Sequence, residues 1–331
     1  MQLFSAKEWA HVTSDFCDLS LIQTWEYGEA KSRVGGWSVE RGIFCDGDCV
    51  IGAVQAFVRR IGLLDRGVVW INRGPLWRRS DTEKPSTLIP MLQALRRYWA
   101  EERGMYLRIA LPVSPGLLGH EVLQDVGYQG TGASGWASAR VDLASPIDDL
   151  RHGLGKKWRQ PLQKAERGGI EVVCGFEDVL FADFLGRYQQ FVARRKFTTS
   201  VTSELLYELK NVSEYDRVLI VSAKLDGQNL GSIAVAGYGD TAEYLAAVVE
   251  DEGRLIGAGH LLLWNAICKA KSLGYRWFDV GGMSPARTPP GIFKFKNGLG
   301  GLPYQHTEEV EAYNASLCNR LIRFMVKCGR A

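Results

Sequence analysis

The sequence has no apolar run that approaches the ~18 residues needed to cross a membrane. It also begins without a basic head followed by an apolar core, so we expect no secretory signal peptide. A dominant charge is missing too, because 40 Lys and Arg face 37 Asp and Glu. These absences favour a cytoplasmic protein, and they place any contact with a polyanion on a local basic patch.

Metal and redox signatures are equally scarce. The seven cysteines show no paired C-x-x-C spacing, and the five histidines form no metal-binding pattern. Cys45 and Cys49 flank a hairpin turn, where reduced thiols are a better interpretation than a metal clip that lacks further ligands. No H-E-x-x-H, G-x-S-x-G or G-x-x-x-x-G-K-[ST] motif occurs, which weakens metallohydrolase, serine hydrolase and P-loop hypotheses. We expect no bound metal.

What the chain does contain is a pattern that occurs twice. With 331 residues, of which 46% are hydrophobic and 23% charged, it is long enough for about two globular domains. Residues 36–60 and 216–238 each predict a hairpin around an Asp-Gly turn, and a strand, a helix and a further strand follow in both places. The matched landmarks are Asp46 with Asp226, Gly52 with Gly231, and Gly104 with Gly274. Two copies at offsets of 170 to 180 residues indicate a domain duplication and not a solenoid.

This order of elements predicts an α+β fold, with largely antiparallel mixed sheets and helices packed on them. We place the boundary after the strand that ends at residue 143, giving domains 1–145 and 146–331. A polar helix is expected within 150–168, and an amphipathic helix within 312–329.

An R-x-x-G-x-G pattern stands between a predicted strand and a predicted helix, at Arg254, Gly257 and Gly259. Backbone amides at such a junction can face an anion, as in the loop by which Gcn5-related acyltransferases hold the CoA pyrophosphate. An ordinary turn followed by a helix cap explains the same residues, so both interpretations stay open.

A second segment is more distinctive. Asp279-Val280-Gly281-Gly282 ends a predicted strand, and Phe295-Lys296 follows thirteen residues after Gly282. Together with residues 22–31, 72–75, 141–143 and 156–169, in that order along the chain, this segment resembles the Fem family. The family contains FemA-, FemB- and FemX-type aminoacyl transferases, which build the cross-bridge of bacterial peptidoglycan from aminoacyl-tRNA.

The resemblance implies two tandem Gcn5-related acetyltransferase-like domains, in agreement with the duplication. It also implies a reaction in which an amine attacks the ester of aminoacyl-tRNA, so the enzyme chiefly orients reactants and stabilises an oxyanion. Lys296 matches the family lysine with that role, and Phe295 matches the aromatic neighbour that shapes the site. A solvated loop lysine is the alternative. Asp279 would orient the amine or accept its proton, or it caps the turn at Gly281 and Gly282.

Other matches concern the acceptor. Lys31 matches the family lysine that contacts the diphosphate of the UDP-linked or lipid-linked precursor, although a surface lysine of a helix is the alternative. Arg73 lies in the matching Gly-Pro turn, which it more plausibly shapes than binds ligand. The family's second phosphate contact, an arginine, does not align: Arg194 and Arg195 lie nearby, but the nearest position is Ser200. This departure leaves the usual precursor, or its pose, open.

Basic residues gather in two further segments. The first offers tRNA phosphates a run of cations with Trp158 available for stacking, and its residues are Lys156, Lys157, Arg159 and Lys164. The second is the terminal helix, whose cations could touch an anionic membrane surface, and these are Arg320, Arg323, Lys327 and Arg330. A solvated charged face and a packed end helix are the respective alternatives.

The leading hypothesis is a monomeric aminoacyl-tRNA-dependent transferase that acts on a peptidoglycan precursor and needs no cofactor. The chain has no room for the helical arm of FemA-type members, so it resembles the compact FemX type. An acyl-CoA-dependent N-acyltransferase, which would bind CoA, is the main alternative. Peptide-bond formation on a small metabolite and a catalytically silent scaffold are the others.

Overall fold

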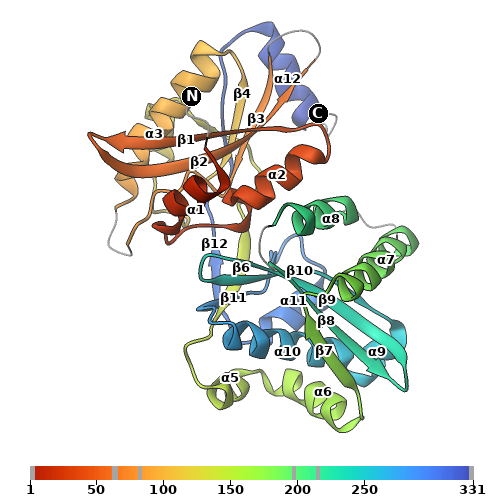
Figure 1. Cartoon of the computed structure of the whole chain (residues 1–331). Coiled ribbons are helices and arrows are strands. Elements are labelled where there is room, and N and C mark those ends of the chain that lie inside the picture. The colour runs from red at the N-terminus through yellow and green to blue at the C-terminus, as the bar shows by residue number, and fades with distance from the viewer. Residues whose placement is uncertain (1–3, 62–65, 81–83, 196–198, 214–216, 328–331) are drawn as a thin grey trace. The chain divides into compact units, whose positions relative to one another are not determined.

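The computed structural model describes residues 4–61, 66–80, 84–195, 199–213 and 217–327 (Figure 1). The chain forms two compact units. The first unit combines Met1–Trp136 with Gln305–Ala331, and the second unit is Ala137–Tyr304. Each unit contains a mixed β-sheet with helices packed on it, so the α+β class expected from the sequence is confirmed.

The sheet of the first unit has the strand order β1-β2-β3-β4-β13-β5. Neighbouring strands are antiparallel except for β3 and β4, which are parallel. The strands are β1 (Ser38–Asp46), β2 (Cys49–Arg60), β3 (Gly67–Asn72), β4 (Tyr106–Ala110), β5 (Gln129–Gly130) and β13 (Val310–Ala312).

Helices cover both faces of this sheet, because side chains alternate along each strand. In β2, Val54 and Ala56 pack in a cluster with Met91 of α3, whereas Ala53 packs with Trp9 of α1. The helices are α1 (Ala6–Ser14), α2 (Trp25–Arg33), α3 (Leu88–Leu95), α4 (His120–Asp125) and α12 (Leu317–Lys327), with short 3-10 turns at Leu21–Gln23 and Pro85–Thr87 and a π-helical turn at Arg96–Glu102.

The sheet of the second unit has the order β12-β6-β11-β10-β9-β8-β7. Strands β7 to β10 are antiparallel, β10 and β11 are parallel, and β6 is antiparallel to β11. The strands are β6 (Ala137–Asp142), β7 (Glu171–Gly175), β8 (Val218–Leu225), β9 (Gln228–Tyr238), β10 (Thr241–Val249), β11 (Trp277–Asp279) and β12 (Leu302–Gln305).

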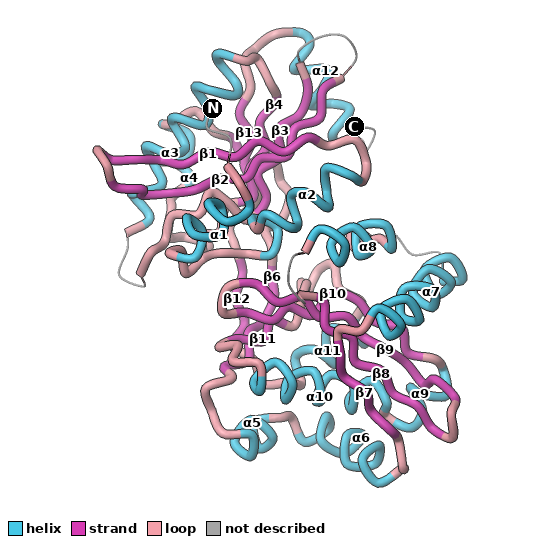
Figure 2. Tube along the Cα trace, in the orientation of Figure 1, coloured by secondary structure: helices cyan, strands magenta, loops and turns pink. Residues whose placement is uncertain are grey.

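Strand β9 is buried along almost its whole length, since α7 and α10 lie on opposite faces of the sheet (Figure 2). The hairpin between β8 and β9 turns at Asp226 and Gly227, both with positive φ, as an Asp-Gly hairpin turn requires. The helices of this unit are α5 (Ile147–Gly153), α6 (Lys156–Arg167), α7 (Asp178–Arg195), α8 (Ser203–Val212), α9 (Asp251–Ile256), α10 (Ala258–Ser272) and α11 (Pro290–Asn297).

The duplicated pattern is visible in the strand pairing. The series β1-β2-β3-α3-β4 and the series β8-β9-β10-α10-β11 both place antiparallel strands before a helix and a parallel strand after it. The strand beside the last one is exchanged: β13 pairs with β4, and β6 pairs with β11. The units therefore differ from the sequence-based domains, because these hydrogen bonds assign β6 to the second unit and residues 305–331 to the first.

Candidate functional site

The candidate site lies in the second unit, where the parallel strands β10 and β11 separate. Their pairing covers three positions and ends at Glu243 opposite Asp279. Beyond it, β10 continues to Val249 and pairs on its other side with β9, with a register shift between Tyr244 and Ala246. Bulges of this kind often lie next to active sites. The chain after β11 leaves the sheet and returns as α11, which carries Lys296.

Asp279 is fully buried and accepts hydrogen bonds at both carboxylate oxygens. Ser138 Oγ donates to Oδ1 at 2.5 Å, and the Gly281 amide donates to the same oxygen at 2.9 Å. The Tyr304 hydroxyl donates to Oδ2 at 2.6 Å, and Arg140 Nε lies 3.5 Å from that oxygen. These contacts fit the interpretation of Asp279 as a cap of the glycine turn, and its handling of an amine stays a prediction.

Lys296 is buried, with 8% of its surface exposed, although its neighbour along α11, Lys294, is exposed. Its Nζ donates to the Gly282 carbonyl at 3.0 Å and lies 5.1 Å from the ring centroid of Tyr244. Burial lowers the pKa of Lys296 from 10.5 to about 8, and the carboxylates of Asp279 and Glu243 oppose this shift. Its burial excludes the alternative of a solvated loop lysine.

The two glycines after β11 lie close to β10 and to the ammonium of Lys296. Gly281 has φ +70°, and a Cβ there would lie 2.3 Å from the carbonyl oxygen of Tyr244 and 3.5 Å from Lys296 Nζ. A larger residue at this position would therefore clash with β10. Gly282 takes part through its backbone, because its carbonyl holds the Lys296 ammonium. Their contact with a substrate stays a prediction.

Helix α6 holds the backbone around Lys296 in place. The indole Nε1 of Trp158 donates to the Phe295 carbonyl at 3.0 Å, and the Gly155 amide donates to the Gly298 carbonyl at 2.9 Å. The rings of Trp158 and Phe295 stack at 5.9 Å. His260 of α10 meets both rings edge-on at 4.9 Å. Trp158 of α6 therefore holds α11 in position through its contacts with Phe295.

This arrangement corrects one expectation from the sequence. Trp158 is 3% exposed and lies in the core cluster of the second unit, so it is not available to stack on RNA bases. His260 beside it is half-buried, and burial lowers the pKa of its imidazole to about 4, which keeps it neutral at pH 7. The basic side chains of α6 do face outward: Lys156, Lys157 and Lys164 are exposed, and Arg159 is partly exposed.

The R-x-x-G-x-G pattern forms the junction of α9 and α10. Gly257 has φ +85°, and a Cβ there would lie 2.5 Å from the backbone oxygen of Pro161 in α6. Gly259 lies under Phe295, at ordinary contact distance, and Arg254 pairs with Asp251 at 3.5 Å. Close packing against α6 thus explains Gly257, and contact of this loop with a phosphate or CoA stays a prediction.

Arg194 and Arg195 lie at the exposed end of α7. Arg194 pairs with Glu250 at 3.0 Å, and Arg195 pairs with Asp251 at 2.8 Å, which ties this end to the start of α9. Neither pair resembles a preformed anion site, because each guanidinium faces a carboxylate. The adjoining Lys196 lies outside the described residues.

Lys31 lies in the last turn of α2 in the first unit, and it is half-buried. Burial, followed by the positive charge of Arg59, lowers the pKa of Lys31. Arg73 is buried in the turn after β3, where its guanidinium lies 4.6 Å from the ring centroid of Trp136. Its position and its φ of 49° fit a role in shaping the turn.

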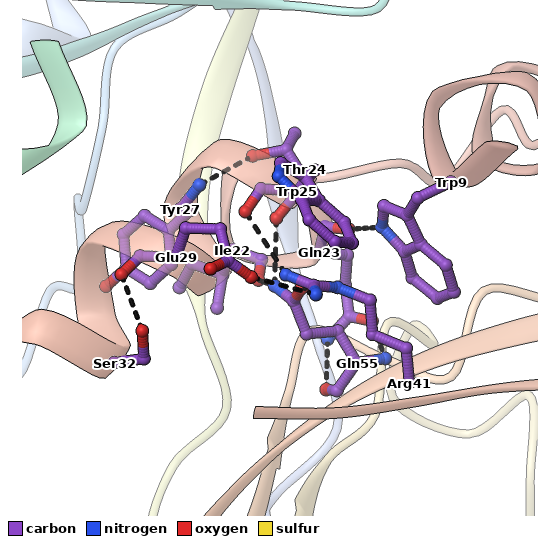
Figure 3. Close-up of polar contacts among 10 residues, drawn as sticks. All are labelled: Trp9, Ile22, Gln23, Thr24, Trp25, Tyr27, Glu29, Ser32, Arg41 and Gln55. Carbon is purple, nitrogen blue, oxygen red and sulfur yellow. Dashed lines mark hydrogen bonds and ion pairs between the residues drawn. The ribbon is translucent and has the colours of Figure 1, made fainter. Parts of the chain in front are cut away.

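A buried polar network attaches the segment before Lys31 to the first sheet (Figure 3). The side-chain amides of Gln23 and Gln55 bond to backbone groups as acceptor and as donor. Gln23 Oε1 accepts from the backbone N–H of Gln55 at 2.8 Å, and Gln55 Nε2 donates to the Thr24 carbonyl at 2.9 Å. Arg41 Nε donates to Gln55 Oε1 at 2.7 Å and its Nη1 pairs with Glu29 at 3.0 Å. The start of α2 is therefore rigidly held.

The terminal helix α12 places its cations differently from the expectation. Arg323 bonds to the buried Glu311 through Nε at 2.6 Å, so its charge is used inside the first unit. Arg320 is exposed, whereas Arg330 and the side chain of Lys327 lie outside the described residues. The packed end helix is the better description, and membrane contact stays a prediction. Within the described ranges, none of the helices has the length and apolar character of a membrane span.

Sequence reasoning missed Glu243, Tyr244, Ser138 and Tyr304. Glu243 alone left a signal, as a charged residue inside an apolar strand. Ser138 and Tyr304 reach Asp279 from 141 and 25 residues away, so no local pattern reveals them. Across the described residues, no group of three or more His, Cys, Asp or Glu side chains is arranged to hold a metal ion.

A comparison with protein families matches most of the second unit to an acetyltransferase domain. Residues 153–297, which include β7 to β11, α10 and Lys296, match the family described as acetyltransferase (GNAT) domain. The chain thus carries a GNAT-type acetyltransferase domain, and this match supports a transferase of the acyltransferase type. No curated protein sequence matches the chain.

Solved structures extend the likeness to the whole chain. A crystal structure of FemX superposes with a TM-score of 0.80 at 14% identity, covering 97% of this chain and 99% of that one. A tandem GNAT protein from the clavulanic acid biosynthesis pathway has a TM-score of 0.51 at 13% identity, with coverages of 93% and 96%. L-PGS from Bacillus licheniformis has a TM-score of 0.52 at 16% identity, with coverages of 92% and 93%. At these identities the likeness shows the tandem GNAT fold alone.

Proposed function

We propose that this protein is an aminoacyl-tRNA-dependent transferase that joins an amino acid to an amine of a peptidoglycan precursor, in the manner of a compact FemX-type enzyme. The observation that carries the proposal is the buried ammonium of Lys296, held between the Gly282 carbonyl and the Tyr244 ring at the point where β10 and β11 separate. The GNAT-type domain and the likeness to FemX support it.

The reaction needs an electrophilic group and no cofactor, because the ester of aminoacyl-tRNA is already activated. The acceptor amine attacks the ester carbonyl and forms the C–N bond, while negative charge develops on the carbonyl oxygen. A buried ammonium stabilises this oxyanion more strongly than a solvated one would, since water does not screen it. Collapse of the intermediate then breaks the bond to the ribose oxygen.

The proton balance also suits Lys296. The attacking nitrogen loses one proton and the departing ribose oxygen gains one. A lysine with a pKa of about 8 can give its proton to the ribose oxygen and take back the proton of the amine. In this scheme Lys296 is a catalytic residue, Phe295 and Trp158 hold α11 in position, and Asp279 maintains the glycine turn and the electrostatics around the ammonium.

The test offers radiolabelled aminoacyl-tRNAs or acetyl-CoA to the purified full-length protein. Each donor is combined with lipid II, with its soluble UDP-linked precursor or with small amines. We expect label to pass from tRNA to a wall precursor, and we expect Lys296→Met to lower this transfer by about 10²–10³-fold. Lys294→Met provides the matched control, because it removes an exposed lysine from the same helix.

The results separate the candidates. Transfer from tRNA that survives Lys296→Met would contradict the assigned role of Lys296. Transfer from tRNA to small amines alone would replace the wall precursor with a small-metabolite acceptor. A wall precursor would be engaged through Lys31, so Lys31→Met should then raise its KM while leaving the KM for aminoacyl-tRNA unchanged.

An acyl-CoA-dependent N-acyltransferase is the second candidate, and the family match of residues 153–297 is the observation that favours it. In that reaction the junction at Arg254, Gly257 and Gly259 would face the CoA pyrophosphate. Transfer from acetyl-CoA alone, or CoA retained on the purified protein, would select this candidate over the first.

A further inference from the structure

A cavity of about 440 Å³ opens beside α6, and its lining includes exposed polar residues of that helix together with the buried Ala165. Apolar side chains form its floor and polar side chains of α6 form its rim. The floor consists of Ala165, Ile170, Leu225 and Ile256, and the rim consists of Gln160, Gln163, Lys164 and Arg167. None of the described residues that line this cavity is acidic.

The rim continues as a stripe along the helix. Lys156, Gln160, Lys164 and Arg167 follow each other at intervals of four, four and three residues, so they share one face of α6. Gln160, Gln163 and Arg167 make no side-chain hydrogen bond within the described part of the chain, whereas Lys164 Nζ reaches the Leu255 carbonyl at 3.4 Å. Most of these donors therefore face solvent.

The charge of α6 is unusual for a helix. Lys156 and Lys157 occupy its first turn, which contains no acidic residue, although the helix dipole favours acids there. The one acidic residue of the helix, Glu166, pairs with Arg151 through both oxygens, with the Arg151 Nη1 contact at 2.8 Å. The stripe thus keeps an uncompensated positive charge, and an anionic partner would offset the unfavourable placement of the two lysines.

We propose that this cavity binds an unpaired nucleotide of an RNA strand that runs along α6. The inference deepens the proposed function and rests on it, because an aminoacyl-tRNA is the RNA that the reaction would bring. The aliphatic floor would cover the face of a base, the amides of Gln160 and Gln163 would meet its edge, and Lys164 and Arg167 would contact phosphates.

A single strand suits this site better than a duplex does. A base must leave its stack to enter an apolar cavity, and unpaired nucleotides pay the least for doing so. The alternation of cations and amides along one helix face also matches the alternation of phosphates and bases along a strand. A membrane surface or a general polyanion would use the cations but not the amides or the floor.

The experiment measures binding of a labelled 12-nucleotide single-stranded RNA to the full-length protein by fluorescence anisotropy. Arg167→Gln should lower the affinity and reduce the slope of log K against log salt by about 0.7. Gln163→Glu keeps the size of the side chain and adds a negative charge at the rim, so it should weaken binding about tenfold. Arg187→Gln, at a partly exposed arginine of α7 that pairs with Asp183, is the control and should change neither quantity.

A 2-aminopurine base in the same RNA reports on the cavity itself. Its emission should change on binding to the wild type and stay unchanged with Gln163→Glu at saturating protein. Three results would each overturn the inference. They are an equal affinity for duplex RNA, displacement of the RNA by heparin to the same extent in every variant, and unchanged RNA affinity in Gln163→Glu. The binding assay is independent of the transfer assay, so the two proposals can fail separately. RNA binding that depends on the cavity, together with no transfer in the transfer assay, would refute the proposed function alone. Transfer with an unchanged KM for tRNA in Gln163→Glu would refute this inference alone.

Discussion

The parallel strands β3 and β4 of the first unit pair over five positions, from Val68–Tyr106 to Asn72–Ala110, whereas β10 and β11 of the second unit pair over three. In the first unit β3 ends where this pairing ends, but in the second β10 runs six residues farther. The two parallel strands thus end together in the first unit, whereas in the second unit β10 continues without its parallel partner. Lys296 lies beside this part of β10, with its Nζ 5.1 Å from the ring centroid of Tyr244.

Each unit also buries a carboxylate near its parallel pair, and the two are neutralised differently. Glu311 on β13 is fully buried and bonds to the Tyr106 hydroxyl at 2.5 Å and to Arg323. Asp279 is equally buried and has an arginine partner too, with Arg140 Nε at 3.5 Å from Oδ2, but hydroxyls and an amide make its shorter contacts, and its charge also acts on the nearby Lys296. An arginine stays charged at any physiological pH, whereas this lysine titrates at about 8. Arg323 is therefore suited to stabilising the fold, whereas Lys296 is suited to exchanging a proton.

We expect the largest difference between the units when the buried or half-buried cation of each, Lys296 or Arg323, is replaced. Lys296→Met should lower kcat by about 10²–10³-fold, because the oxyanion loses its buried partner. Arg323→Met should leave kcat nearly unchanged and reduce the free energy of unfolding by about 2 kcal/mol, since Glu311 loses its counter-charge. Steady-state kinetics and urea unfolding measure the two effects, and similar kcat losses in both variants would contradict the assignment.

The same lysine should weaken the fold that contains it. The pKa of Lys296 falls from 10.5 to about 8 on folding, which corresponds to about 3 kcal/mol against the charged form below pH 8. Loss of the hydrogen bond to Gly282 offsets about 1 kcal/mol of this. Lys296→Met should therefore be more stable than the wild type at pH 7 by about 2 kcal/mol. This advantage should shrink as the pH rises from 8 to 10.5, because the wild type then folds without the charge, and urea unfolding across that range checks it.

Changing the carboxylates tests the second half of the comparison. Asp279→Asn removes a charge that raises the pKa of Lys296, so the alkaline fall in kcat/KM should move to lower pH. Glu311→Gln in the first unit should cost stability but leave the pH profile in place. A pH profile that is the same for Asp279→Asn and the wild type would show that Lys296 does not control the alkaline limb.

The smallest effect concerns the indole contact that positions α11. Trp158→Phe keeps a ring against Phe295 but removes the donor to its carbonyl, so stability should fall by about 1 kcal/mol. We expect kcat to fall about threefold to tenfold at unchanged KM, because Lys296 is held less precisely. Trp99→Phe, at a buried indole of the first unit, is the control and should change stability without changing kcat. Equal changes in kcat would reduce Trp158 to a core residue.

Local patterns carried most of the fold. The hairpins at Asp46 and Asp226 and the helices that stop at Gly104 and Gly274 follow from alternation, helical periodicity and turn residues. The exchange of β6 and β13 does not, because strands of six and three residues have no local property that selects a partner far along the chain. The sequence-based boundary near residue 145 differs from the observed division for this reason.

The site was predictable to the extent that it follows a contiguous motif. The structure brings Lys296, Asp279 and the two glycines together, whereas the groups that satisfy Asp279 come from distant strands. Trp158 shows how a local cue misleads. Its basic neighbours suggested a stacking platform, although its spacing to Leu162 and Ala165 already placed it on the buried face of the helix.

The exchanged strands also bear on the order in which the protein matures on the ribosome. Strand β4 is complete by residue 110, but its neighbour β13 is made only at residues 310–312. Until then the nascent chain exposes the unpaired edges of β4 and β5, which attract other strands. The N-terminal sheet can therefore be complete only after residues 310–312 have been synthesised, and we expect a chain truncated within the second unit to keep these edges unpaired and to aggregate.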